Sequence, residues 1–161
     1  MNKEEQYKEL LPQLEAIVAG EGDEIANMAN VAAMLHTTFG FWWTGFYRVV
    51  NCQPSASSNQ KRNAELVLGP FQGPVACTRI PHGKGVCGTA WERGETVIVP
   101  DVHKFKGHIA CSSASNSEIV VPVFKGGEVT AVLDIDSKDF GTFDEEDKYW
   151  LEKIVKQCFA Q

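Results

Sequence analysis

Residues 118–137 read Glu118-Ile-Val-Val-Pro-Val-Phe-Lys-Gly-Gly-Glu-Val-Thr-Ala-Val-Leu-Asp-Ile-Asp-Ser137, and this stretch decides the fold. It holds two runs rich in β-branched residues, 118–124 and 128–137, with Lys-Gly-Gly between them. Runs of this composition around a glycine turn predict two antiparallel strands joined as a hairpin. The chain is therefore expected to build a sheet around this hairpin.

The second strand of the hairpin carries two acids, Asp134 and Asp136, at a spacing of two. Alternate residues of a strand share a face, so both carboxylates lie on one side and Leu133 and Ile135 on the other. Two negative charges on one face are unfavourable unless a nearby positive charge compensates them, and a bound amine would provide that charge. The structural alternative is a strand end at which both acids face solvent.

Glu118 begins the first strand of the hairpin and is a third candidate acid. It shares a face with Asp134 and Asp136 only if the numbers of opposed residues sum to an even value. A three-residue loop at 125–127 gives that register, which we predict. A two-residue turn at Gly126 and Gly127 would place Glu118 on the opposite face.

The rest of the chain predicts further short strands and several helices. Strands are expected at 42–50, 65–72, 76–80 and 96–99, amphipathic helices before residue 40 and at 144–159, and a short helix after the glycine-rich segment 82–91. Asp23 is the expected N-cap of the second helix, and Thr142 or Asp144 that of the last. This order of helices and strands predicts an α+β domain with a roughly six-stranded antiparallel sheet. The N- and C-terminal helices of the domain are expected to pack mainly on one face of that sheet.

Length and composition narrow the class of protein. The chain has 161 residues, 43% of them hydrophobic, and a net charge of −6, which is typical of one soluble domain and disfavours nucleic acid or an anionic membrane as partner. The polar N-terminus and the short apolar runs predict neither a signal peptide nor a membrane span, so we expect a cytoplasmic protein. We expect residues 1–161 to form a single domain in which 51–63 is an inserted polar loop.

The five cysteines raise the question of thiol chemistry. An odd number of cysteines in a reducing compartment favours free, catalytic or metal-binding thiols over a disulfide framework. Cys111 lies among small polar residues just before the hairpin and is a candidate nucleophile, although a buried inert cysteine is the alternative. Trp43 and Tyr47 are four apart on one strand and share a face, either in the core or beside a ligand.

Two other kinds of site receive weak support. The glycine-rich segment 82–91 has the spacing of neither a Walker loop nor a dinucleotide fingerprint, so it favours tight turns over a phosphate cradle. A zinc site would have to draw on residues without any paired short spacing such as Cys-x-x-Cys, namely Cys77, His82, Cys87, His103, His108 and Cys111.

Several motifs together resemble one family along the whole chain. They are Gly69-Pro-Phe-Gln-Gly73, Ala76-Cys77, Gly85-Val-Cys-Gly-Thr-Ala90, Asp101-Val-His103, Gly107-His-Ile-Ala-Cys111, Ser117-Glu-Ile-Val-Val-Pro122 and Val132-Leu-Asp-Ile-Asp-Ser137. In combination they resemble the free methionine-(R)-sulfoxide reductases, which are GAF-domain enzymes, so this resemblance implies a GAF-like layout of the sheet and helices. The segment 51–63 is longer than expected for the bacterial members.

This resemblance implies roles for eight residues. Cys111 matches the cysteine that attacks the sulfoxide sulfur, Cys77 the one that resolves the resulting sulfenic acid, and Cys87 a third cysteine with a less defined part in the relay. Glu118 matches the acid that assists the departing oxygen. The other matches concern substrate binding: the ammonium group for Asp134 and Asp136, and the methyl and thioether end for Trp43 and Tyr47.

The resemblance further implies reduction of free L-methionine (R)-S-oxide, a disulfide recycled by a thioredoxin-type reductant, no metal or organic cofactor, and a homodimer. A thiolate can displace the sulfoxide oxygen only if that oxygen is protonated, so an acid kept protonated by burial suits the reaction. The alternative is a GAF domain that senses a small ligand without catalysis, because fold alone does not determine function.

Overall fold

The computed structural model describes residues 1–51, 64–109 and 114–160. Within these residues, six strands form one antiparallel sheet in the order β3-β2-β1-β6-β5-β4. The strands are β1 (Trp43–Asn51), β2 (Ala64–Gln72), β3 (Arg79–Pro81), β4 (Val97–Val99), β5 (Ser117–Lys125) and β6 (Glu128–Ser137). The hairpin quoted above forms β5 and β6, and β6 pairs with both β5 and β1.

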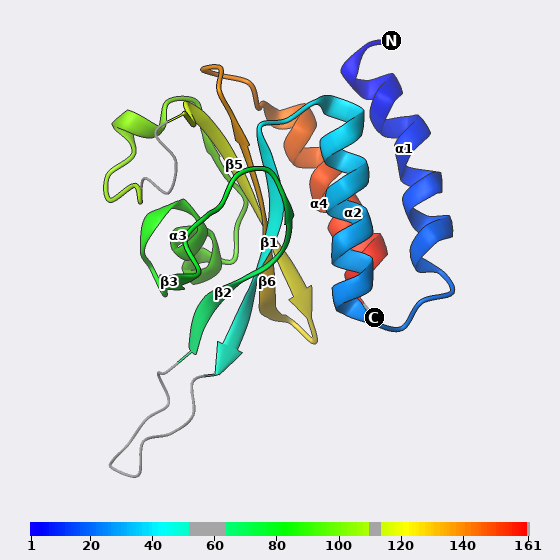
Figure 1. Ribbon diagram of the computed structural model, residues 1–161, viewed down its shortest axis with the longest axis horizontal. Coiled ribbons are helices and arrows are strands. Elements are labelled where there is room, and N and C mark those ends of the chain that lie inside the picture. The colour runs from blue at the N-terminus through cyan, green and yellow to red at the C-terminus, as the bar shows by residue number, and fades with distance from the viewer. Residues whose placement is uncertain (52–63, 110–113, 161) are drawn as a thin grey trace.

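Two of three long helices lie against one face of this sheet, the third packs on their outer side, and a shorter helix lies on the other face (Figure 1). The long helices are α1 (Lys3–Val18), α2 (Glu24–Phe39) and α4 (Glu145–Phe159), and the shorter one is α3 (Gly85–Arg93). This arrangement confirms the predicted α+β class with helices mainly on one face. Asp23 and Asp144 are the N-caps of α2 and α4, so the predicted cap of α2 is confirmed and Asp144, rather than Thr142, caps α4.

The two faces of the sheet bury two separate apolar clusters. Under the long helices, Phe46, Leu133 and Ile135 are fully buried in the main core. On the other face, Trp43 and Tyr47 belong to a second cluster with residues of α3. The alternation of strand side chains therefore sends Asp134 and Asp136 to the face of α3 and away from the main core.

The β5–β6 hairpin corrects one detail of the sequence analysis. Lys125 pairs with Glu128, so the turn holds only Gly126 and Gly127, both with positive φ, and the predicted three-residue loop is wrong. A register shift between Val123 and Phe124 then adds one residue to β6. This β-bulge restores an even sum, so Glu118 pairs with Asp136 and shares its face as predicted.

The third strand also differs from the prediction. It covers Arg79–Pro81 and not 76–80. In the segment before it, Thr78 O accepts one backbone hydrogen bond from Leu68 of β2, and Ala76 packs against the second cluster. Two carbonyls of this preceding segment accept hydrogen bonds from side chains of β1: the Trp43 indole donates to Pro74 O and the Tyr47 hydroxyl to Cys77 O. No helix among the described residues is long and apolar enough to cross a membrane.

Candidate active site

A cavity lies between the sheet and α3, on the face opposite the long helices. Six of the eight predicted site residues line it, together with nine others. The six are Trp43, Tyr47, Cys87, Glu118, Asp134 and Asp136. The structure therefore gathers acids, aromatics and one thiol from β1, β5, β6 and α3 around one space.

The three acids are the most unusual feature of this cavity. Glu118 and Asp134 are only 5% and 6% exposed, and Asp136 lies directly opposite Glu118 in the β5–β6 ladder. Burial, together with the charges of Asp134 and Asp136, raises the pKa of Glu118 well above its usual range. Burial likewise raises the pKa values of both aspartates, so the group holds protons that carboxyl groups in water would lose.

Asp134 is the acid best placed to carry negative charge. Hydrogen bonds from Glu118 and Cys87 oppose the rise of its pKa, which burial causes. Its Oδ1 atom is nevertheless buried without a hydrogen-bond partner among the described residues. A buried carboxylate oxygen without a partner calls for a hydrogen-bond donor or a cation from outside the protein.

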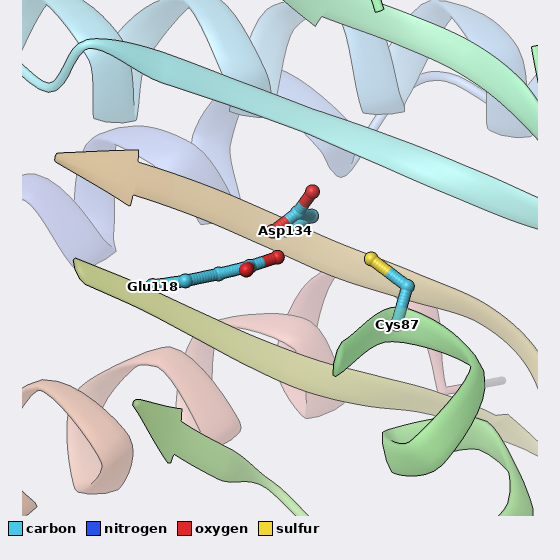
Figure 2. A group of neighbouring side chains, drawn as sticks. All are labelled: Cys87, Glu118 and Asp134. Carbon is cyan, nitrogen blue, oxygen red and sulfur yellow. The ribbon is translucent and has the colours of Figure 1, made fainter. Parts of the chain in front are cut away.

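Cys87 comes from the first turn of α3 and points toward the acids of β5 and β6 (Figure 2). It is a free, buried cysteine. Burial and the charge of Asp134 raise the pKa of its thiol well above the usual range, so it is a poor nucleophile in this state. Its position beside the acids, with a raised thiol pKa, does not support Cys87 as the residue that attacks the substrate.

Trp43 and Tyr47 form the aromatic wall of the cavity. Their rings stack with centroids 6.0 Å apart, and Trp43 also stacks on Phe71. Gly45 lies between them on the same face, and a Cβ atom there would come within 2.4 Å of Phe71 and 2.7 Å of the Trp43 ring. Glycine is thus required at this position for the wall to close.

Two polar residues of the cavity were not given a role by the motifs. Ser115 donates a hydrogen bond of 2.9 Å to Asp136, and His108 Nε2 lies 3.7 Å from Glu118 Oε2. Burial lowers the pKa of His108, so its contact with Glu118 joins a neutral imidazole and a protonated carboxyl group. Both residues flank Cys111 in the sequence. Sequence patterns suggest His108 only as a possible zinc ligand, and proximity to Cys111 is the only signal that could have pointed to Ser115.

The cysteines of the chain differ in their bonding state. Cys77 is disulfide-bonded, whereas Cys87 and Cys158 are free. Cys77 follows Ala76, which lines the cavity. Cys111 lies outside the described residues, as does Cys52 and most of the predicted inserted loop. Chain on both sides of Cys111, at His108, Ile109 and Ser115, lines the cavity.

Comparison with known proteins agrees with this arrangement. The GAF domain family model matches residues 31–158. The free methionine-R-sulfoxide reductase of Escherichia coli is 45% identical over 98% of this chain and 88% of its own length, and that of Saccharomyces cerevisiae 41% identical over 97% and 85%. The X-ray structure of free methionine-R-sulfoxide reductase from Neisseria meningitidis in complex with its substrate has a TM-score of 0.89 and 51% identity, covering 98% and 89% of the two chains. The chain therefore belongs to the GAF domain family and, within it, to the free methionine-R-sulfoxide reductases.

Proposed function

We propose that this protein reduces free methionine (R)-sulfoxide to methionine in the cavity between the sheet and α3. Cys111 is the nucleophile, Cys77 the resolving cysteine and Glu118 the general acid. The observation that carries the proposal is the meeting of two buried acids, Glu118 and Asp134, and the partly buried Asp136 with an aromatic wall in one cavity. Such a space matches a small molecule with an ammonium group at one end and an apolar group at the other.

The acids explain why the substrate is a free amino acid. Asp134 and Asp136 lie on one face, and Asp134 has a buried oxygen to which no described residue donates a hydrogen bond. An α-ammonium group would donate to this oxygen and favour the charged forms of both aspartates. A methionine sulfoxide residue inside a peptide has no such group, so it would leave the acids without a compensating positive charge or hydrogen-bond donor.

The stacked rings of Trp43 and Tyr47 suit the other end of the substrate. They offer an apolar surface to the methyl and thioether carbons. With the ammonium held by the aspartates and the methyl group by the rings, the R and S epimers direct the sulfoxide oxygen to opposite sides. Discrimination between them follows if only one epimer presents its oxygen to Glu118.

Glu118 supplies the proton that the departing oxygen needs. Burial and the charges of Asp134 and Asp136 raise its pKa well above the usual range, which favours the protonated form that a general acid needs. The Cys111 thiolate attacks the sulfoxide sulfur, and the sulfur–oxygen bond breaks as the protonated oxygen leaves as water. Water then attacks the Cys111 sulfur, so that methionine departs with the electron pair of the sulfur–sulfur bond and Cys111 becomes a sulfenic acid. The Cys77 thiol then condenses with this sulfenic acid, which releases water and forms a disulfide.

A disulfide that forms in each cycle must be reduced from outside. A dithiol of the thioredoxin type would do so by thiol–disulfide exchange, and Cys87 is available as an intermediate thiol because it is free while Cys77 is disulfide-bonded. The homodimer implied by the family resemblance stays a prediction, which light scattering would check. The sensor alternative is less favoured, because the curated reductases align with nearly the whole chain.

The test is thioredoxin-coupled turnover on the separated R and S epimers of free methionine sulfoxide, beside a peptide-bound substrate. We expect turnover of the free R epimer alone. Cys111→Ser should abolish it, and Glu118→Gln should lower kcat by about a hundredfold, since general acid catalysis contributes on that order. The matched control is Cys158→Ala, which removes a buried cysteine of α4 in the other core.

Three results would contradict the proposal. Full activity of Cys111→Ser would exclude it as the nucleophile, and full activity of Glu118→Gln would exclude that acid. Absence of turnover with every substrate, in fully reduced protein, would favour the ligand-sensor alternative. Binding of free methionine without turnover would then identify the sensed ligand.

A further inference from the structure

We propose that Cys87, Glu118 and Asp134 form a Zn²⁺ site inside the cavity, and that the metal and the substrate exclude one another. The site goes beyond the reductase reaction, which needs no metal. It would make the enzyme sensitive to free zinc, because two of the three ligands are acids that the substrate or the reaction requires.

The first support is geometric. One ligand atom from each of the three side chains, a sulfur and two carboxylate oxygens, lies within 4.8 Å of the other two. They come from α3, β5 and β6, and their side chains point toward one another (Figure 2). Zinc binds sulfur at roughly 2.3 Å and oxygen at roughly 2.1 Å, so small side-chain rotations would bring all three into contact with one ion.

The second support is the missing positive charge. All three ligands are buried, and the described residues that line the cavity include no lysine or arginine. Asp134 Oδ1 is buried without a hydrogen-bond partner among the residues that the structure describes. A buried acceptor of this kind can be satisfied by a water molecule, an ammonium group or a metal ion, and only the last two also supply positive charge.

The donor set selects the kind of metal. A thiol sulfur beside two carboxylate oxygens favours Zn²⁺ over Mg²⁺ or Ca²⁺, which prefer oxygen ligands alone. His108 lies 3.7 Å from Glu118 and offers an imidazole nitrogen as a fourth donor. The free volume of about 50 Å³ is enough for the ion with a water molecule.

The site is independent of the catalytic disulfide. Cys87 is free in a structure in which Cys77 is disulfide-bonded, so the three ligands are together when that pair of thiols is consumed. On binding, Zn²⁺ takes the place of the Cys87 thiol proton and of any proton held between Glu118 and Asp134. These protons pass to solvent, and no electron is transferred.

Cobalt substitution tests the site without any turnover. The oxidised protein, with its disulfide intact, is titrated with Co²⁺ and then with Zn²⁺, and the near-ultraviolet thiolate-to-cobalt band is recorded. We expect one equivalent of Co²⁺ to produce the band in the wild type and in Cys158→Ala. Zn²⁺ should abolish the band, and Cys87→Ser should never show it.

A second variant and a competitor complete the test. Asp134→Asn keeps the shape of the side chain and every thiol, and we expect it to weaken Co²⁺ binding at least tenfold. Free methionine (R)-sulfoxide, which the oxidised protein cannot reduce, should raise the apparent Kd for Co²⁺ in proportion to its concentration. No step of this test depends on enzyme activity. The metal-binding proposal can therefore be disproved while the reductase proposal is supported, and the reductase proposal can be disproved while metal binding is supported.

Three results would overturn the proposal. A band of normal strength in Cys87→Ser would place the metal on another thiol, and unchanged affinity in Asp134→Asn would exclude that ligand. Co²⁺ binding that is insensitive to saturating substrate would disprove the mutual exclusion. Absence of a band in the wild type would disprove the site itself.

Discussion

Glu118 and Asp136 lie directly opposite each other across the β5–β6 ladder, on the face that α3 covers. Two acids in this position cannot both be charged without a cation, since like charges in a buried pair repel. Burial, and then the neighbouring charges, raise the pKa of each above its usual range. The protein without substrate therefore stores an unfavourable interaction that grows as the pH rises.

The first prediction concerns the stability of the substrate-free protein. Glu118 has a higher pKa in the folded than in the unfolded chain, so between these two values the folded state binds more protons. The free energy of unfolding must then fall as the pH rises through this window, by up to about 1.4 kcal/mol per pH unit for one proton. We expect urea denaturation to show this decline from about pH 5 upward, and Glu118→Gln to flatten it.

Two comparisons make this measurement specific. Saturating methionine should reduce the pH-dependent fall in the free energy of unfolding of the wild type, because its ammonium group compensates the negative charges that the acids acquire. Glu146→Gln, at an acid in the first turn of α4, is the control and should leave the slope as it is. Equal slopes for the wild type and Glu118→Gln would show that the pKa of Glu118 is not raised.

The hairpin shows how far the sequence determines this arrangement. Alternation along β6 correctly places Asp134 and Asp136 on one face, because the side-chain period of a strand is fixed. Whether Glu118 shares their face depends on the length of the turn and on any bulge in the hairpin. The turn is one residue shorter than predicted and the bulge adds one residue, so the two differences cancel. A bulge inside a β-branched run has no composition signal, so the correct face was reached through a wrong loop.

The wall of the cavity shows a similar limit. The spacing of Trp43 and Tyr47 predicts a shared face, and the structure confirms it. The hydrogen bonds of the same residues to the carbonyls of Pro74 and Cys77 could not be foreseen, because they join segments thirty residues apart through backbone atoms that every sequence has. The contacts of Ser115 and His108 with the acids could not be predicted for the same reason, since only the fold brings these residues to Asp136 and Glu118.

The second prediction concerns Ser115. Its hydroxyl donates a hydrogen bond of 2.9 Å to Asp136, which opposes the rise in the pKa of that acid. In Ser115→Ala the acid should be protonated more often and bind an ammonium group less well. A lost hydrogen bond to a charged group is worth about 1.5 kcal/mol, so we expect KM to rise about tenfold with a smaller change in kcat.

Steady-state kinetics across pH would separate this effect from simple damage. The rise in KM should shrink toward higher pH, where Asp136 loses its proton even without Ser115. Thr96→Ala is the control, since Thr96 donates its hydroxyl hydrogen bond to Glu152, outside the cavity. A rise in KM that is the same at every pH would show that Ser115 acts by shape alone.

The third prediction tests the stability of the helical layer apart from the site. Tyr7 of α1 is fully buried, and its hydroxyl donates a hydrogen bond of 2.8 Å to Asp147 of α4. Tyr7→Phe would leave a buried carboxylate short of one donor, which costs about 1–3 kcal/mol. Thermal unfolding should show a lower Tm, while kcat/KM at 25 °C stays normal. Tyr149→Phe, at a largely exposed ring, should change neither, and a loss of activity in Tyr7→Phe would instead couple α1 to the cavity.

The fourth prediction links the aromatic wall to the fate of the oxidised cysteine. The Tyr47 hydroxyl donates a hydrogen bond of 2.9 Å to Cys77 O, and the Trp43 indole one of 3.0 Å to Pro74 O, so the wall holds both ends of the segment before β3. Tyr47→Phe removes the first of these bonds and keeps the ring. The Cys77 thiol should then meet the sulfenic acid less often, because a looser segment samples more positions.

The measurement is a single turnover with one equivalent of substrate in the presence of dimedone, which captures sulfenic acid. Wild-type protein should form one disulfide for each methionine released, with little dimedone adduct. We expect Tyr47→Phe to give several times more adduct for each methionine, whatever its rate of methionine formation. Tyr149→Phe serves as the matched control. An equally low adduct yield in Tyr47→Phe would show that Cys77 is positioned without this hydrogen bond, and that Tyr47 acts on the substrate alone.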